Sequence, residues 1–155
     1  MGETATVGNE PTDEHYPWIE DVVAPDVGSA GHIDNIQIAQ LMYDAWMRYL
    51  LDGVGLDREI FNRQGRPTVR EITARFDGEV FPGDALKCGV RALSRRRRSF
   101  TLEEVLWKAS DGRRLASGTV VLVTVDPTTY TPVEVPAELW SEIERAEQRE
   151  IPIAT

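Results

Sequence analysis

The spacing of hydrophobic positions changes along the chain, and each change predicts a different element of secondary structure. Residues 18–24, WIEDVVA, are apolar and partly β-branched, which is typical of a short strand. Residues 25–31, PDVGSAG, have the composition of a loop. From residue 36 to residue 51 the apolar side chains recur at steps of three and four, which predicts a helix. They nearly encircle that helix, so we expect it to be buried.

Capping residues mark both ends of this helix. Asp34 or Asn35 can serve as the N-cap, because a side-chain oxygen there accepts a hydrogen bond from a free N–H group of the first turn. Gly53 and Gly55 are suited to end the helix.

Beyond a loop at residues 62–67 the spacing becomes two, which predicts strands. In the first of these strands, one face carries Arg70, Ile72, Ala74 and Phe76. The turn Pro82-Gly83-Asp84 follows, and after it comes a second strand, which contains Cys88. Third and fourth strands are predicted over about 99–109 and 114–126, joined by a hairpin at residues 110–112. Residues 136–148 begin with proline and continue with good helix formers, which predicts a short helix.

This order of elements predicts an α+β fold in which a curved antiparallel sheet wraps around one central helix. The four long strands are expected to follow one another as a meander, because hairpin connections give antiparallel pairs. A helix that is apolar on most sides must then be covered by the sheet. We expect one domain over residues 15–148. Residues 1–14 are acidic and lack a large apolar cluster, which predicts a disordered tail, and residues 149–155 are expected to form a loose end after the last helix.

Composition narrows the classes of function. The chain has 155 residues, and its 17 basic and 26 acidic side chains give a net charge of −9, which argues against a nucleic-acid-binding protein. The one cysteine, Cys88, excludes an internal disulfide and favours the cytoplasm. We find no membrane span and no signal peptide in the sequence. The local exception to the acidic character is a run of four arginines, Arg95–Arg98.

Five ordered segments resemble the hotdog-fold acyl-CoA thioesterases of the 4-hydroxybenzoyl-CoA thioesterase type. They lie between about Trp18 and Leu139 and read DVGSAGHIDN at 26–35, DAW at 44–46, FPGD at 81–84, RRSF at 97–100, and ASG at 116–118 followed by VTVD at 123–126. Two positions depart from the family pattern. Gly28 stands where many relatives have an aspartate, and Trp46 stands where arginine is usual.

The resemblance implies hydrolysis of an acyl-CoA or acyl-carrier thioester to a free acid and a thiol. This reaction needs a carboxylate, acting as nucleophile or as base on water, and donors for the developing oxyanion. Asp34 is the first candidate for the carboxylate, Asp44 the second and Asp26 the third, with Asn35 positioning water. The backbone of Gly31, His32 and Ile33 would hold the thioester oxygen beside the start of the helix.

Each of these residues also has a purely structural interpretation. Asp34 and Asn35 could simply cap the helix, and Gly31 could be required only by a positive φ. Asp26 could belong to a turn, and a structural role is also open for His32. Asp44 could pair with Arg48 one turn later.

The arginine run and two aromatic residues are the candidates for substrate binding. In the resembling thioesterases this region meets the nucleotide phosphates of coenzyme A, which implies that Arg96, Arg97 and Arg98 do so here. Strand alternation would send Arg95 and Arg97 to one face and the other two to the opposite face. The alternative to phosphate binding is that the four arginines only form a solvated strand edge that prevents aggregation. Tyr43 or Trp46 could line an acyl tunnel or serve only in packing.

Two other functions remain open at this stage. One is a hotdog-fold hydratase or dehydratase, although Asp26 and His32 miss the Asp-x4-His spacing of those enzymes by one residue. The other is a non-catalytic acyl-CoA-binding protein, which Gly28 would favour. We expect no metal and no cofactor, since coenzyme A is part of the substrate. A homodimer or homotetramer is expected, because one short sheet cannot cover all sides of its helix.

Overall fold

The computed structural model describes residues 16–26, 31–56 and 65–154. Its elements, in chain order, are β1 (Trp18–Val23), α1 (Asn35–Arg48), the π-helical turn η3 (Tyr49–Gly53), β2 (Arg66–Phe76), β3 (Ala85–Arg95), β4 (Ser99–Lys108), β5 (Arg114–Val125) and α3 (Ala137–Glu147). The predicted tail at residues 1–14 lies outside the described residues. In the part of the chain that is described, no helix has both the length and the apolar character needed to cross a membrane.

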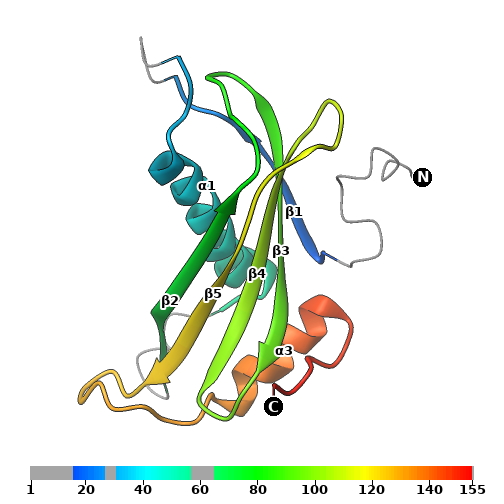
Figure 1. Cartoon of the computed structure of the whole chain (residues 1–155). Helices are drawn as coiled ribbons and strands as arrows, with labels where there is room; N and C mark the ends of the chain where they lie inside the picture. Colours follow the sequence, from blue (N-terminus) through cyan, green and yellow to red (C-terminus); the bar gives the residue numbers. More distant parts are fainter. Residues whose placement is uncertain (1–15, 27–30, 57–64, 155) are drawn as a thin grey trace.

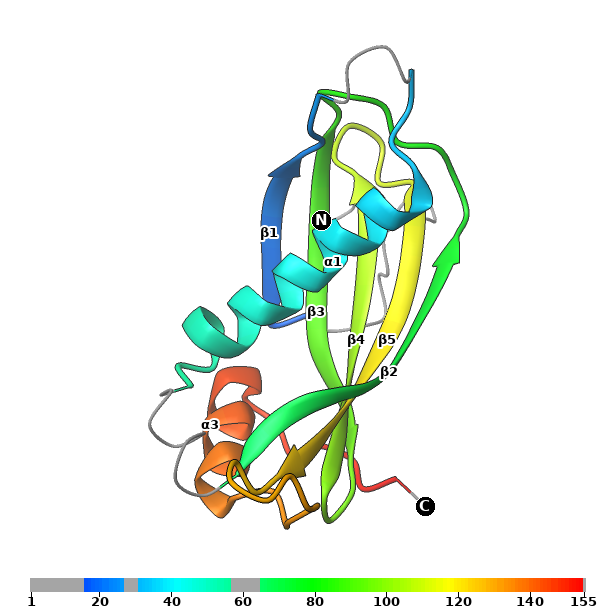
Figure 2. The ribbon, with the colours of Figure 1, turned by 90° about the vertical axis from the view of Figure 1, so that its left-hand side faces the viewer.

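The five strands form one antiparallel sheet in the order β1-β3-β4-β5-β2. The sheet curves, and α1 lies against its concave face (Figures 1 and 2). The predicted α+β fold, a curved antiparallel sheet around one central helix, is therefore confirmed.

The predicted meander of four strands is wrong in one respect. β3, β4 and β5 are joined as consecutive hairpins, but β2 pairs with β5 at the far edge of the sheet and not with β3. The segment between β2 and β3 instead passes the start of α1, where Ile33 and Val80 form an isolated bridge. Period-two spacing identifies a strand but not its neighbour, and this connection is longer than a tight hairpin loop.

Helix α1 begins at a capping box. The Asp34 carboxylate accepts a hydrogen bond from the Gln37 N–H at 2.9 Å, and the Gln37 side chain accepts one from the Asp34 N–H at 3.1 Å. Ile38, Met42 and Ala45 from this helix are buried against the sheet. The predicted cap at Asp34 is confirmed. The helix is buried on one face only, because the apolar Ile36 and Met47 on its other side are exposed.

The sheet has two differently covered faces. On the concave face the inward residues of β3 and β4, including the fully buried Cys88, join the α1 residues in the main core. On the convex face Tyr16, Val105 and Trp107 form a small separate cluster. Residues of β4 therefore alternate between the face that meets the helix and the face that meets Tyr16.

Helix α3 closes the end of the core beneath η3. The buried Glu147 carboxylate accepts hydrogen bonds from the Tyr49 hydroxyl and the Ala92 N–H, both at 2.5 Å, and pairs with Arg149 at 2.8 Å. Burial, the Glu147 charge and this hydrogen bond together raise the pKa of Tyr49. Glu147 therefore ties α3 to both η3 and β3.

Residues 149–154 do not form the loose end expected from the sequence. Ile151 is buried, and its N–H donates to the Glu144 carboxylate at 3.1 Å. The backbone of Arg95 then bonds to Pro152 and Ala154 at 2.8 and 2.9 Å, beside the end of β3. The helix ends at Glu147, where Gln148 takes a left-handed conformation, so Pro152 is not what stops it. The apolar Ile151 then still reaches the core.

Candidate active site between helix α1 and strand β2

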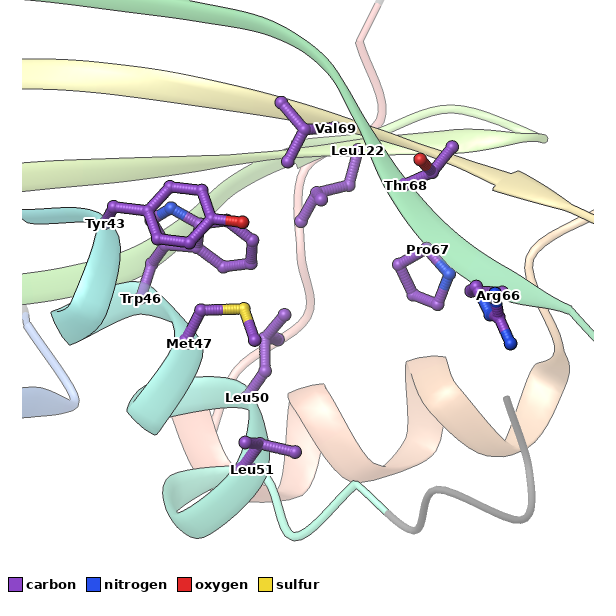
Figure 3. Close-up of a pocket in the computed structure, with 10 residues that line it drawn as sticks. All are labelled: Tyr43, Trp46, Met47, Leu50, Leu51, Arg66, Pro67, Thr68, Val69 and Leu122. Atoms are coloured by element: carbon purple, nitrogen blue, oxygen red, sulfur yellow. The ribbon is translucent and has the colours of Figure 1, made fainter. Parts of the chain in front are cut away.

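A cavity lies between the second half of α1, η3 and the start of β2 (Figure 3). Its volume is about 570 Å³, and its lining is mostly apolar: Tyr43, Trp46, Met47, Leu50, Leu51, Arg66, Pro67, Thr68, Val69 and Leu122. Tyr43 and Trp46 meet edge to face on its wall, with ring centroids 4.8 Å apart. The structure thus places both aromatic residues predicted for an acyl tunnel on one cavity.

A second, smaller cavity continues along the first half of α1. It has a volume of about 170 Å³ and shares Tyr43 and Trp46 with the larger one. Ile36 and Gln40 form its helix wall, and Ile72 of β2 lies opposite. The two cavities therefore follow the same gap between the helix and the β2 edge of the sheet.

A β-bulge determines which β2 side chains face this gap. The register with β5 shifts between Val69 and Glu71, so Arg70 is the extra residue. Ile72 and Ala74 then line the smaller cavity. The sequence prediction that Arg70 shares their face does not allow for this bulge, which period-two spacing alone does not reveal.

The start of α1 is fixed to the sheet just before the capping box. Gly31 has φ of +83°, as its structural interpretation requires, and a Cβ built there would have no atom within 4 Å. Ile33 is buried and donates its N–H to the Val80 carbonyl oxygen at 2.7 Å. The Ile33 amide, one of the three that the sequence suggested as oxyanion donors, is therefore already hydrogen-bonded within the protein.

Two other amides at the helix N-terminus fit the donor role better. The capping box engages the N–H groups of Asp34 and Gln37, and the Ile38 N–H makes the first bond inside the helix, to the Asp34 carbonyl oxygen at 3.0 Å. Among the described residues, no partner is seen for the amides of Asn35 and Ile36. They point along the positive end of the helix dipole, where an oxyanion is stabilised.

Asp44 and Arg48 are not joined by the ion pair expected from their spacing. The Asp44 carboxylate accepts a hydrogen bond from the Gln40 amide at 2.8 Å. Arg48 instead forms a bidentate pair with Glu20 of β1, with its Nε 2.9 Å from one carboxylate oxygen. This pair raises the pKa of Arg48. The sequence could not show that β1 brings a carboxylate within reach of the helix.

Asp26, His32 and Asn35 all lie on the surface near the start of α1. Asp26 directly precedes residues 27–30, so Gly28 lies outside the described residues. These three residues are exposed, and they do not line either cavity. No distance between their side chains assigns a catalytic role to one of them.

The arginine run forms a turn, so its predicted alternation between strand faces is wrong. Arg95 ends β3 and stacks on Trp140 at 5.1 Å, while the Arg96 N–H bonds to Ser99 across the turn at 2.8 Å. Arg97 pairs with Glu134 at 2.5 Å. This turn lies at the opposite end of the sheet from the start of α1 (Figures 1 and 2). Eleven residues of β3 separate the two ends, a distance of about 33 Å.

Glu104 is the functional candidate that the sequence analysis overlooked. It lies on β4, lines the smaller cavity and is only 3% exposed. Burial raises its pKa to about 7. A signal was available, because Glu104 interrupts the inward series Phe100, Leu102 and Leu106. A glutamate at a core position of a strand is costly unless it is paired or used.

Over residues 16–26, 31–56 and 65–154, no three His, Cys, Asp or Glu side chains are grouped so that they could hold a metal ion.

Comparison with known families gives one match. Residues 22–143 match the thioesterase-like superfamily. The match begins at the end of β1, spans α1 and all the remaining strands, and ends within α3. No curated protein matches the sequence.

Solved structures share the fold over nearly their whole length. A thioesterase from Thermus thermophilus, solved with coenzyme A and zinc, is 23% identical, with a TM-score of 0.72 over 86% of this chain and 96% of that one. A 1,4-dihydroxy-2-naphthoyl-CoA thioesterase from Synechocystis is 15% identical, with a TM-score of 0.72 over 81% and 93%. A hypothetical protein from Staphylococcus aureus, solved with coenzyme A, is 15% identical, with a TM-score of 0.75 over 88% and 87%.

Proposed function

Because the chain belongs to the thioesterase-like superfamily, we propose that it hydrolyses acyl-CoA thioesters in the gap between α1 and β2. Water adds to the thioester carbonyl carbon, the C–S bond breaks, and a free acid and a free thiol leave. Family membership confirms the hydrolase class that the sequence predicted. Coenzyme A enters as part of the substrate, and the protein's own residues supply the chemistry.

One observation carries this proposal: an apolar cavity of about 570 Å³ continues into the gap beside the first half of α1. A thioester needs an apolar chamber for the acyl group and polar groups at the reacting carbon. The amides of Asn35 and Ile36 would face the developing oxyanion, with Asp34 and Asn35 beside them. Tyr43 and Trp46, which line both cavities, would then lie at the boundary between the thioester group and the acyl chamber.

The narrower proposal is an enzyme of the 4-hydroxybenzoyl-CoA thioesterase type. Its support is the ordered set of sequence segments, from DVGSAGHIDN at 26–35 to VTVD at 123–126. The aromatic wall formed by Tyr43 and Trp46 is compatible with an aromatic acyl group. We place the enzyme in the cytoplasm, in keeping with its single buried cysteine.

We further propose that the active form is at least a homodimer, joined along β2. This strand has a hydrogen-bonded neighbour on one side only, and its residues from 70 to 75 are exposed. Ile72 of β2 and Ile36 of α1 are large apolar residues that are 51% and 80% exposed beside the cavities. An open strand edge with exposed apolar side chains beside it favours pairing with a second copy.

A two-fold dimer of this kind would also explain the position of the arginine turn. Antiparallel pairing of β2 with its copy places the start of α1 in one protomer on the same side as the partner's β3–β4 turn. Arg96, Arg97 and Arg98 would then bind the phosphates of a coenzyme A whose thioester lies in the other protomer. Within one protomer the two ends of the sheet are too far apart for this.

The test is thiol release from a panel of thioesters, measured with the full-length protein. The panel contains aliphatic acyl-CoAs of increasing length, an enoyl-CoA, benzoyl-type acyl-CoAs and acyl carrier protein thioesters. We expect release of free coenzyme A from at least one acyl-CoA class. Hydration of an enoyl-CoA without thiol release would point to a hydratase, and binding of acyl-CoA without turnover would point to a binding protein.

A further inference from the structure

The side chain of Glu104 is buried without a complete set of hydrogen bonds. It lies on the concave face of β4 between Leu102 and Leu106, both fully buried, and is itself 3% exposed. Its Oε1 has no hydrogen-bond partner. In the described part of the chain, the only other buried side-chain oxygen in this condition is Oγ1 of Thr124. A buried carboxyl with an oxygen that lacks a hydrogen-bond partner destabilises the fold, so its presence points to a functional role.

Glu104 faces the gap between α1 and β2. It lines the cavity of about 170 Å³ together with Ile36, Gln40 and Tyr43 of the helix. That cavity begins in the first turn of α1 and shares Tyr43 and Trp46 with the acyl chamber. The carboxyl is therefore placed between the helix N-terminus and the chamber, where the thioester carbon of the proposed substrate would lie.

Within the described residues, no charged group lines this cavity beside Glu104. From α1 come Tyr43 and Gln40, whose amide is engaged by Asp44. The buried Cys88 of β3 does not line the cavity, and the pKa of its thiol is raised mainly by burial and also by the charge of Glu104. β2 and β5 contribute only Ile72, Ala74 and Val120. Desolvation alone raises the pKa of Glu104, to about 7, so the carboxyl can both take and return a proton near neutral pH.

The carboxylates predicted from the sequence are less suited to this role. Asp34 is exposed and its carboxylate caps the helix. Asp44 accepts from Gln40. Asp26 lies on the surface outside both cavities.

We propose that Glu104 is the general base of the hydrolysis. This inference rests on the proposed thioesterase function. The carboxylate takes a proton from water while the water oxygen bonds to the thioester carbon. The intermediate then breaks its C–S bond, and the protonated Glu104 returns the proton to the departing sulfur. The products are the free acid and the thiol, and the carboxylate is restored.

The experiment compares the unaltered protein with Glu104→Gln and Glu103→Gln on an accepted acyl-CoA. Glutamine keeps the size of Glu104 but cannot accept the proton, so kcat should fall by about 10²- to 10⁴-fold while KM changes little. In the unaltered enzyme, kcat plotted against pH should rise with a pKa near 7. This rising limb of the pH profile should be absent in Glu104→Gln. Glu103 lies on the opposite face of the same strand, bonded to Tyr16 and Arg91, so its variant should keep both the rate and the limb.

The outcomes separate this inference from the proposed function. Turnover by Glu104→Gln within about threefold of normal, or an unaltered enzyme whose kcat lacks the limb, would overturn the role of Glu104 and leave the thioesterase standing. A raised KM with kcat intact would assign Glu104 to binding and also overturn the inference. No thiol release by the unaltered protein from any thioester would overturn both. The pH profile needs no variant, so the test does not depend on Glu104→Gln folding.

Discussion

Ile33 and Val80 are joined by a backbone hydrogen bond of 2.7 Å, from the Ile33 N–H to the Val80 carbonyl oxygen. Both residues are buried, so this bond fixes the start of α1 against the segment between β2 and β3. It also removes the Ile33 amide from the donors available to a substrate. The amides of Asn35 and Ile36, for which no partner is seen among the described residues, are the oxyanion donors that we propose in its place.

Replacement of Asp34 should separate capping from chemistry. Asp34→Ala removes the acceptor for the Gln37 N–H and should lower the free energy of unfolding by about 1 kcal/mol, whereas Asp34→Asn should lower it by much less because asparagine caps nearly as well. Both losses are measured by urea unfolding. If Glu104 is the base, Asp34→Asn keeps most of the turnover. A folded but inactive Asp34→Asn would return the catalytic role to Asp34.

Glu147 should be among the most destabilising positions on α3. Glu147→Ala removes a buried acceptor from Tyr49 and Ala92 and the ion-pair partner of Arg149, which should cost about 3 kcal/mol. Glu142→Ala on the same helix removes an exposed pair with Arg145 and should cost less than about 1 kcal/mol. Equal losses for the two variants in urea unfolding would contradict the buried network.

The β2 edge should control the oligomeric state. We expect the protein to sediment as a dimer or larger at micromolar concentration, and Ile72→Lys to shift it toward the monomer, because a charge would be buried in the new interface. Val23→Lys is the control, since Val23 is 70% exposed on β1 at the opposite edge. A monomeric unaltered protein, or dissociation by the Val23 variant alone, would rule out pairing through β2.

Glu104 should make stability fall as the pH rises. Burial raises the pKa of Glu104 to about 7, whereas in the unfolded chain the carboxyl ionises near its ordinary value of about 4.3. Between these values the unfolded state releases a proton that the folded state keeps. The free energy of unfolding should therefore drop by about 3 kcal/mol from the lower pKa to the higher one and then level off.

The glutamine variant isolates this contribution. Glu104→Gln does not titrate, so its stability relative to the unaltered protein should increase from pH 5 to pH 8 in urea unfolding. A difference that stays constant over that range would show that the carboxyl ionises normally in the folded protein.

Local patterns predicted the elements of this fold well, because each depends on neighbours in the sequence. The helix capped by Asp34 is predicted by a spacing of three and four and by the capping residue. The turn at Gly83 is predicted by a glycine, and the structure gives this glycine a positive φ of +82°. The position of β2 beside β5 was not predictable in this way, because pairing joins residues such as Ala74 and Gly118 that are distant in the chain.

In the candidate site too, local features were predictable from the sequence and long-range contacts were not. Spacing placed Tyr43 and Trp46 together on the helix, and the structure puts both on the cavity wall. The partner of Arg48 is Glu20, which lies 28 residues earlier, so helical spacing suggested Asp44 instead. Glu104 becomes a candidate only when the gap between α1 and β2 is known. The alternation of polar and apolar residues along β4 does not by itself distinguish a functional buried carboxyl from an exposed one.

The proposed hydrolysis requires the acyl group to lie in the cavity between α1 and β2. This requirement is tested by kcat/KM for acyl-CoAs of increasing acyl size, measured on the unaltered protein, Met47→Trp and Met47→Leu. Met47 lines the cavity and is 36% exposed, so tryptophan can fill part of the chamber without disrupting the core. We expect Met47→Trp to lose activity toward large acyl groups and keep it toward small ones, with Met47→Leu nearly unchanged. An equal effect of Met47→Trp on every acyl group would contradict binding of the acyl group in this cavity.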